Sequence, residues 1–277
     1  LFLNIAPMKL HTLHTRYFKL DGGAMFGVVP KPLWEKLNPP DENNKCTWAM
    51  RCLLVEIEDR KILIDSGIGD KQSDKFFSFY EPHGGEGLSG ALASLGLKPE
   101  DITDHVLTHL HFDHCGGSII RDSAGELQPY FPNATYHISQ PQWESAMNPN
   151  PREKASFLPE NIKPMEKAAH LNLIPADEPE KTLFSGFKVR FYHGHTDGMM
   201  VPVLDFNGQT LVYMADLLPS RYHYKPPYVM AFDIRPLDTM EEKPQFLTEA
   251  QQKGYVLFFE HDPEVACARL QQGEKGI

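Results

Sequence analysis

The stretch ITDHVLTHLHFDHCGG, residues 102–117, contains four potential metal ligands within six positions. Its first part is apolar enough to form a buried strand. In an extended segment, side chains two positions apart point to the same side, so His109 and His111 can share one metal ion. Asp113 and His114 follow where the chain turns toward two glycines, and they can face a second ion. Four ligands suit two metal ions better than one.

Three further candidate ligands follow strands that are predicted later in the chain. Loops at the ends of strands on a rigid sheet are a common source of functional groups, so we expect these side chains to join the first four. Five imidazoles and two carboxylates form a nitrogen and oxygen set that suits Zn²⁺, with Fe, Mn or Co as alternatives. These three ligands are His195 after 187–193, Asp216 at the end of 201–216, and His261 within 254–262.

Two predicted hairpins, 52–67 and 201–216, resemble each other, because each places an Asp (Asp65 or Asp216) at the end of its second strand. Asn207-Gly208 is a strong turn signal in the second hairpin. No linker separates the halves, so we expect a single domain over 1–277, with two similar β-rich layers and helices outside. We also expect a lead-in over 1–45 with a strand near 14–20, a helix over 87–98, a strand over 102–110, a loop over 121–135, a strand over 135–139, helices over 141–182, and a closing helix after Asp262.

Composition narrows the class of protein. The net charge is −10, which makes a nucleic-acid partner a poor expectation and favours a small-molecule substrate. Apolar runs are far shorter than the roughly 20 residues that span a membrane, so no membrane partner is expected. Four scattered cysteines fit a cytoplasmic location, although export stays open because the first residue is not Met. A homodimer is a further expectation.

The chain resembles the metallo-β-lactamase superfamily through His109–His114, the Gly194-His195-Thr196 triplet, Asp216 and His261. The resemblance spans 52–262. It implies an α/β (α+β) fold, a four-layer αββα sandwich, and two divalent metal ions with zinc as the first expectation. By this resemblance His109, His111 and His195 hold one ion, Asp113, His114 and His261 hold the other, Asp216 bridges the two, and Asp65 supports the ligands from behind.

The segment FKLDGGAMFGVVPKPLW, 18–34, further resembles the lactonase and parathion-hydrolase-like branch, whose N-terminal segment lines the substrate entrance. Met25 and Phe26 fit an apolar wall for an acyl chain, although core positions are the favoured interpretation. Lactonases of this branch can carry a Tyr three residues after the bridging Asp, and Pro219 stands there in this chain. The candidates to replace it are Tyr222 or Tyr224, and His223 beside them is a further candidate for substrate contact.

The resulting hypothesis is a metal-dependent hydrolase in which a metal-bridging hydroxide opens lactones or cleaves esters. N-acyl homoserine lactones, the substrates of quorum quenching, are the first substrate class, and Asp113 is the catalytic residue that passes the proton. One alternative is an organophosphate triesterase or thioesterase at the same site. The other is a metal-bound sensor without turnover. The physiological substrate, the native metal and the oligomeric state stay open.

Overall fold

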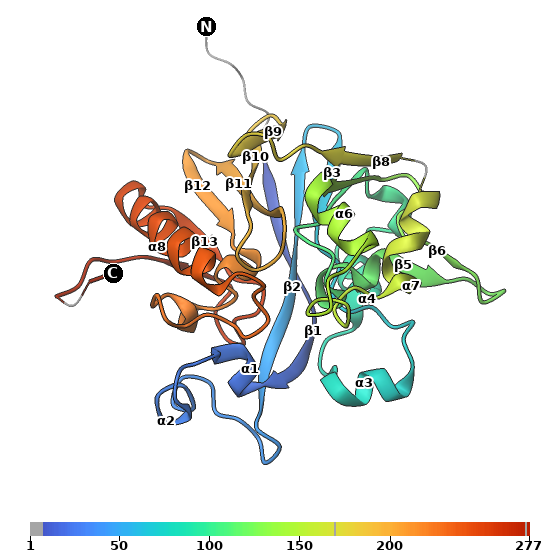
Figure 1. Cartoon of the computed structure of the whole chain (residues 1–277). Coiled ribbons are helices and arrows are strands. Elements are labelled where there is room, and N and C mark those ends of the chain that lie inside the picture. The colour runs from blue at the N-terminus through green and yellow to red at the C-terminus, as the bar shows by residue number, and fades with distance from the viewer. Residues whose placement is uncertain (1–7, 169, 275) are drawn as a thin grey trace, which may run out of the picture.

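Two six-stranded sheets form the middle of the molecule (Figure 1). The computed structural model describes residues 8–168, 170–274, 276 and 277. The first sheet has the strand order β1-β2-β3-β4-β7-β8 and the second β14-β13-β12-β11-β10-β9, while β5 and β6 pair separately. The strands are β1 (Lys9–Asp21), β2 (Lys45–Ile57), β3 (Arg60–Ile64), β4 (Asp104–Val106), β5 (Ile119–Arg121), β6 (Leu127–Pro129), β7 (Thr135–Ser139), β8 (His170–Ile174), β9 (Glu180–Phe184), β10 (Phe187–Tyr192), β11 (Met199–Phe206), β12 (Gln209–Tyr213), β13 (Val256–Phe258) and β14 (Cys267–Arg269).

The sheets pack face to face over a shared apolar core. Leu53 and Val55 of β2 point into this core, where they join Val189 of β10 and Val212 of β12. Leu54 lies between them in sequence and belongs to a second core on the other face of the first sheet. Successive side chains of a strand point to opposite faces, so a strand that is apolar at every position contributes to two cores.

Helices cover the outer faces of both sheets and complete the predicted four-layer αββα arrangement (Figure 1). Helices α4 and α6 contribute Leu88, Leu92 and Ala146 to the outer core of the first sheet. Helix α8 places Phe246 and Leu247 in the core of the second sheet. Within the described residues, no helix is both long and apolar enough to cross a membrane. The helices are α1 (Gly22–Phe26), α2 (Lys31–Trp34), α3 (Asp74–Tyr80), α4 (Gly87–Ser94), α5 (Phe112–Cys115), α6 (Gln140–Met147), α7 (Pro159–Ile162) and α8 (Pro236–Lys253).

The two predicted hairpins are confirmed, as β2–β3 and β11–β12. Their two-residue turns begin at Glu58 and Asn207, which both have a left-handed φ, 55° and 52°. Each hairpin is extended by a parallel strand, since β3 pairs with β4 and β12 pairs with β13. The chain crosses from the first sheet to the second once, over 175–179 between β8 and β9.

Several secondary-structure predictions are wrong or incomplete. The predicted loop over 121–135 contains β6, and the strand predicted over 102–110 is limited to β4, Asp104–Val106. The predicted closing helix after Asp262 is absent; the Asp262 carboxylate accepts the N–H groups of Glu264 and Val265 as a cap would, but the chain then pairs with β13 as strand β14. The region 141–182 contains β8 and β9 beside its helices. Helix α8 was not predicted, because Pro244 within it breaks the usual helical pattern.

The lead-in is more regular than predicted. The single strand near 14–20 is the 13-residue strand β1, which pairs with β2 along its whole length around one bulge. Helices α1 and α2 follow, and Phe26 and Trp34 pack against Trp48 in a third apolar cluster that reaches Met230. Residues 1–7 of the predicted lead-in lie outside the described residues. The described part covers one end of the two sheets (Figure 1).

Candidate metal centre

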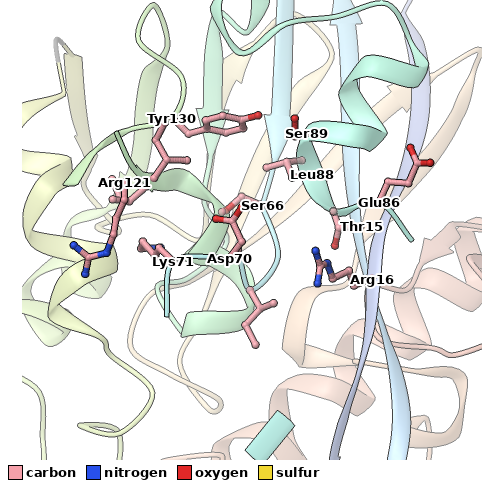
Figure 2. A pocket seen from close by; sticks show the side chains of 16 residues that line it. Thr15, Arg16, Ser66, Asp70, Lys71, Glu86, Leu88, Ser89, Arg121 and Tyr130 are labelled. Carbon is pink, nitrogen blue, oxygen red and sulfur yellow. The ribbon is translucent and has the colours of Figure 1, made fainter. Parts of the chain in front are cut away.

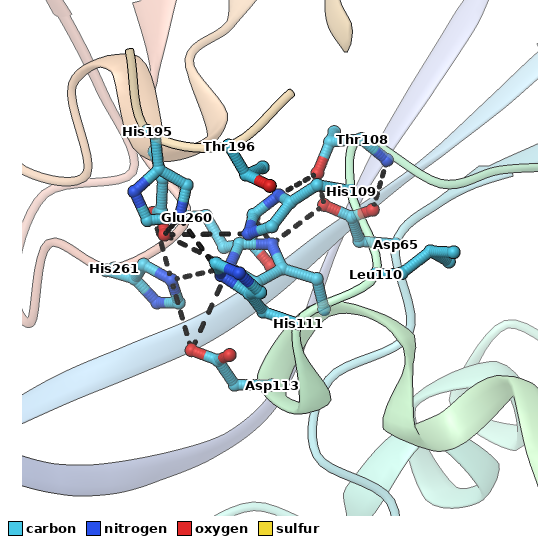
Figure 3. A network of polar contacts seen from close by, with 12 residues as sticks. Asp65, Thr108, His109, Leu110, His111, Asp113, His195, Thr196, Glu260 and His261 are labelled. Atoms are coloured by element: carbon cyan, nitrogen blue, oxygen red, sulfur yellow. Dashed lines mark hydrogen bonds and ion pairs between the residues drawn. The ribbon is translucent and has the colours of Figure 1, made fainter. Parts of the chain in front are cut away.

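The seven predicted ligands meet at one edge of the two sheets, and most of them are drawn in Figure 3. Each follows a strand that ends at this edge. The turn after β4 supplies His109 and His111, and α5 supplies Asp113 and His114. The second sheet contributes the remaining three ligands: His195 after β10, Asp216 after β12 and His261 after β13.

One group of ligand atoms consists of three imidazoles and a carboxylate. His109, His111, His195 and Asp216 each offer one nitrogen or oxygen, and all four atoms lie within 4.8 Å of one another. The Nε2 atom of His195 is 3.1 Å from Nδ1 of His111 and 3.1 Å from Oδ2 of Asp216. Three nitrogens and one oxygen at this spacing suit a tetrahedral zinc site.

A second group consists of Asp113, His114 and His261. The Nε2 atoms of the two histidines are 3.1 Å apart. Oδ2 of Asp113 lies 3.8 Å from Nε2 of His114 and 3.7 Å from Nε2 of His261. The two nitrogens and one oxygen of this set therefore lie close enough together to bind one metal ion.

The Asp216 carboxylate lies between the two groups. Its Oδ2 atom is 3.1 Å from His195 and 3.5 Å from His114, and its Oδ1 atom is 3.4 Å from His261. One carboxylate therefore faces histidines of both groups. This position fits the bridging role that the resemblance implies for Asp216.

Hydrogen bonds behind the histidines decide which ring nitrogen is free. Nδ1 of His195 donates to Asp233 at 2.9 Å, and Nδ1 of His261 donates to the Ala49 carbonyl at 2.8 Å. Nδ1 of His109 is 3.1 Å from the Thr108 hydroxyl. In a neutral imidazole, a proton on Nδ1 leaves the Nε2 lone pair free for a metal, so these partners present Nε2 of each ring to the centre.

Asp65 occupies the supporting position that was predicted for it. Its side chain is fully buried, and it accepts the Thr108 amide at 2.8 Å and the Thr108 hydroxyl at 2.7 Å (Figure 3). It also lies 3.2 Å from Nδ1 of His114. Asp65 thus fixes the turn that carries the first ligands as well as the orientation of His114.

Three supporting carboxylates were missed by the sequence analysis. Glu153 lies 3.4 Å from Nε2 of His111, so Nδ1 of that ring is the atom left for the centre. Glu260 lies 3.0 Å from Nδ1 of His114 and is fully buried. Asp233 accepts from His195 and Thr239. Glu260 directly precedes His261, which was an available signal, whereas no motif marks Glu153 or Asp233.

Burial and neighbouring charge favour the neutral imidazole at some positions. Burial, together with His114 and His111, holds the pKa of His109 well below its usual value. Burial also lowers the pKa of His111 and His261. For His195, burial lowers the pKa but Asp216 and Asp233 more than offset it. A neutral imidazole is the form that binds a metal ion.

The residues fit a pair of divalent ions. His109 Nε2 and Asp216 Oδ1 are fully buried and have no hydrogen-bond partner within the described residues. An unpaired buried polar atom costs free energy, and two such atoms that converge with five other ligand groups are best explained as cation ligands. The donor set is the nitrogen and oxygen set that zinc and similar ions prefer.

A cavity of about 480 Å³ opens onto the ligand cluster. Met25 and Phe26 are both buried in the third apolar cluster, which is the favoured interpretation from sequence, and of the two only Met25 also lines the cavity. Tyr222 and His223 are not among its lining residues. His223 is buried, stacks on Phe26 and lies 3.0 Å from the Met25 carbonyl, so it holds the lead-in in place.

A tyrosine of α3 lines the cavity, although the tyrosines expected there from the sequence follow Pro219. Tyr80 at the end of α3 is among the lining residues, and its ring packs on Phe112 with centroids 4.5 Å apart. Pro219 uses its carbonyl to accept the His261 amide at 3.1 Å. The two candidates from sequence, Tyr222 and Tyr224, lie outside the cavity lining.

Comparison with known proteins identifies related sequences. A family model described as the metallo-beta-lactamase superfamily matches residues 51–261. An N-acyl homoserine lactonase of Bacillus cereus is 25% identical over 251 residues, which cover 82% of this chain and 86% of that protein.

Solved structures show the same fold. A probable metal-dependent hydrolase from Staphylococcus aureus superposes with a TM-score of 0.87 at 30% identity, over 96% of this chain and 94% of that one. AidC, a dizinc quorum-quenching lactonase in complex with a homoserine product, gives a TM-score of 0.78 at 21% identity, over 99% of this chain and 94% of that one.

Proposed function

Because the chain belongs to the metallo-β-lactamase superfamily and is a metal-dependent hydrolase, we propose that its substrates are lactones, with N-acyl homoserine lactones as the first class. The observation that carries the proposal is that five of the seven clustered ligands line a cavity that can hold a small molecule. The Bacillus relative that is named as a lactonase supports the substrate class.

The cavity has an apolar wall and a polar base. Several apolar side chains of the wall come from segments far apart in sequence, and such a surface suits the acyl chain of a substrate. The base presents His111, Asp113 and Asp216. An ester carbonyl at the base would thus lie next to the ligand cluster while the acyl chain contacts the wall. The wall consists of Leu20, Ala24, Met25, Phe79, Phe112, Met230 and Phe232.

Two divalent ions held by the seven ligands would supply Lewis-acid polarisation of the carbonyl and an acidified water. The chain's own residues prepare this chemistry. Asp65 and Asp233 form hydrogen bonds that orient two of the rings, and Glu153 faces a third at 3.4 Å, so these ligand atoms are placed in advance. The apolar wall excludes water around the ester.

Asp113 is the residue that we assign to proton transfer. It is 8% exposed and lines the cavity, and it also lies at the edge of the ligand cluster. Hydrolysis breaks the ring C–O bond and adds the elements of water across it. A proton must therefore move from water to the leaving ring oxygen, and a carboxylate at the boundary between ligands and substrate can carry it.

The test combines metal analysis with turnover of N-hexanoyl homoserine lactone. We expect about two equivalents of metal in the purified protein and ring opening that a chelator abolishes. Asp216→Asn should lower turnover by at least about 100-fold, because it removes a carboxylate that faces both ligand groups. Asp205→Asn, an exposed change in β11, is the matched control and should be neutral.

Two results would overturn the proposal at different levels. Hydrolysis of a phosphotriester or thioester without any lactone turnover would replace the substrate class and leave the metal-dependent hydrolase intact. Less than one equivalent of metal after reconstitution would show that the seven residues do not form a working centre.

A further inference from the structure

A second cavity, of about 520 Å³, shares no lining residue with the catalytic cavity (Figure 2). Ser66 and Gly117 form part of its wall. Ser66 donates its hydroxyl to the His114 carbonyl at 3.0 Å, so this wall is the back of the turn that carries the metal ligands. The cavity is thus separate from the catalytic cavity but adjoins the same turn.

Three cationic side chains line this cavity: Arg16, Lys71 and Arg121. Arg16 points from β1 toward the cavity, and Lys71 lies across from it (Figure 2). Lys71 donates to the Gly116 carbonyl, and Arg121 donates to the Gly125 carbonyl at 3.0 Å. Within the described residues, Arg16 has no side-chain hydrogen bond, and none of the three cations forms an ion pair. Among the residues that the structure describes, the three cations of the cavity therefore have no carboxylate within ion-pair distance.

Two carboxylates, Asp70 and Glu86, also line the cavity, so its formal charge is +1, three cations against two anions. The Glu86 side chain folds back along α4, where a Cβ on Gly90 would lie 2.9 Å from its Oε2 atom. In Figure 2 it points away from Arg16. Asp70 is exposed. Within the described residues, neither carboxylate forms a hydrogen bond or an ion pair with Arg16.

The first turn of α4 adds to the positive potential. Gly87, Leu88 and Ser89 line the cavity, and the preceding Glu86 makes no capping hydrogen bond with its side chain. A Cβ on Gly87 would lie only 3.6 Å from Nε and Nη2 of Arg16, so the guanidinium lies beside the helix start. A cation at the positive end of a helix is unfavourable unless an anion accompanies it.

We propose that this second cavity binds a small organic phosphate, with the phosphate group between Arg16 and the start of α4. Lys71 on the other side of the cavity attracts the same anion. Leu88, Ile119 and Tyr130 provide apolar surface for the organic part of the ligand. Guanidinium groups and helix starts bind both carboxylate and phosphate oxygens. A phosphate monoester is preferred here because it carries a charge near −2 at neutral pH and offers three acceptor oxygens to several cations.

The experiment titrates phenyl phosphate into the zinc-loaded, isotope-labelled protein and follows backbone amide signals by NMR. We expect Gly87, Leu88 and Ser89 to shift in a saturable way. Phosphate could also bind at the metal centre, so the amides of Gly194, His195 and Thr196 are followed in parallel. Benzoate in place of phenyl phosphate tests a carboxylate as the ligand.

Two variants address the cavity itself. Arg16→Gln should weaken binding about ten-fold, the size expected for a lost charge-assisted hydrogen bond. Ser89→Glu places a carboxylate in the first turn of α4, where a helix tolerates it, and should also block the anion. Arg269→Gln removes an exposed guanidinium on β14 of the second sheet and should leave the affinity unchanged.

The proposal fails if the shifts are confined to Gly194, His195 and Thr196, which would assign the anion to the metal centre. It also fails if Arg16→Gln and Ser89→Glu both bind phenyl phosphate as tightly as the unmodified chain. Tighter binding of benzoate than of phenyl phosphate would overturn phosphate as the ligand class.

Discussion

The hairpins β2–β3 and β11–β12 have the same connection to a parallel strand but contribute to the metal centre in different ways. In the first, Asp65 directly follows β3 and lies behind the ligands. In the second, Asp216 comes three residues after β12 and lies among the ligands. Both exits contain a non-glycine residue with left-handed φ, Asp65 at 56° and Ala215 at 44°. Asp216 therefore lies two residues farther beyond its strand than Asp65 does. The carboxylate after the longer exit is a ligand, and the one after the shorter exit supports the ligands.

The carboxylates that support the ligand histidines should have a large influence on metal binding in both halves. Asp65→Asn and Asp233→Asn should each lower zinc affinity about 10- to 100-fold, because each carboxylate orients a ligand histidine. Asp65→Asn should also cost about 2 kcal/mol of unfolding free energy, since an NH2 group replaces the oxygen that accepts from the Thr108 hydroxyl and lies beside Nδ1 of His114. Chelator competition and urea unfolding measure the two quantities.

Asp205→Asn again serves as the control for these two variants. Wild-type zinc affinity in Asp65→Asn would show that the first hairpin does not support the centre. Equal losses of unfolding free energy in Asp65→Asn and Asp233→Asn would show that the contacts of Asp65 with Thr108 add no stability beyond that of the Asp233 contacts.

Each half also contains a lysine whose pKa is lowered by its surroundings, and the pH dependence of stability tests this shared feature. Lys71 donates to the Gly116 carbonyl and Lys243 to the Tyr228 carbonyl. Burial lowers the pKa of both to about 8. Lys243 is 1% exposed, so it provides the clearer test.

Between pH 8 and its ordinary value of 10.5, the Lys243 amine is protonated in the unfolded chain but neutral in the folded one. Stability therefore rises with pH in this window and is lower below it. We expect the unfolding free energy to rise by about 2 kcal/mol from pH 7 to 9.5 through this group. Lys243→Met should remove that rise, while the exposed Lys75→Met should retain it. An unchanged pH profile in Lys243→Met would contradict the prediction.

The hairpin turns that begin at Glu58 and Asn207 should change the unfolding free energy only slightly. Glu58 has a left-handed φ of 55°, which costs a residue with a Cβ atom about 1 kcal/mol. Asn207 adopts a φ of 52° with less strain, because Asn tolerates this region better than Glu. Glu58→Asn should therefore raise the unfolding free energy by about 0.5 kcal/mol, and Asn207→Ala should lower it by a similar amount. Thermal unfolding of both variants measures the difference, and the same sign for both would contradict it.

The two halves also differ in how much of them the sequence predicts. His109, His111, Asp113 and His114 form one local motif, so their closeness follows from their spacing in the sequence, although they lie on the turn after β4 and on α5 and not on a strand. The later ligands are separated by long segments, and they were joined to the first four by their positions at predicted strand ends and by the resemblance to a family. Glu153 could not be found in this way, because its contact with His111 depends on how 150–157 folds over the cavity.

The same division applies to the fold. The alternating apolar pattern and the Asn207-Gly208 turn predicted both hairpins. Strand β14 was mistaken for a helix, because the residues around Asp262 satisfy the rules of a helix start while tertiary pairing with β13 selects a strand. Local signals therefore fail where a non-local partner decides the conformation.

The single crossing at 175–179 divides the molecule in a way that suits a split reporter. A chain cut there yields one fragment with every strand of the first sheet and another with every strand of the second. His109 and His111 remain on one fragment, and His195 and Asp216 on the other, although all four belong to one ligand group. Neither fragment holds a complete group, so catalysis would report only on their reassembly.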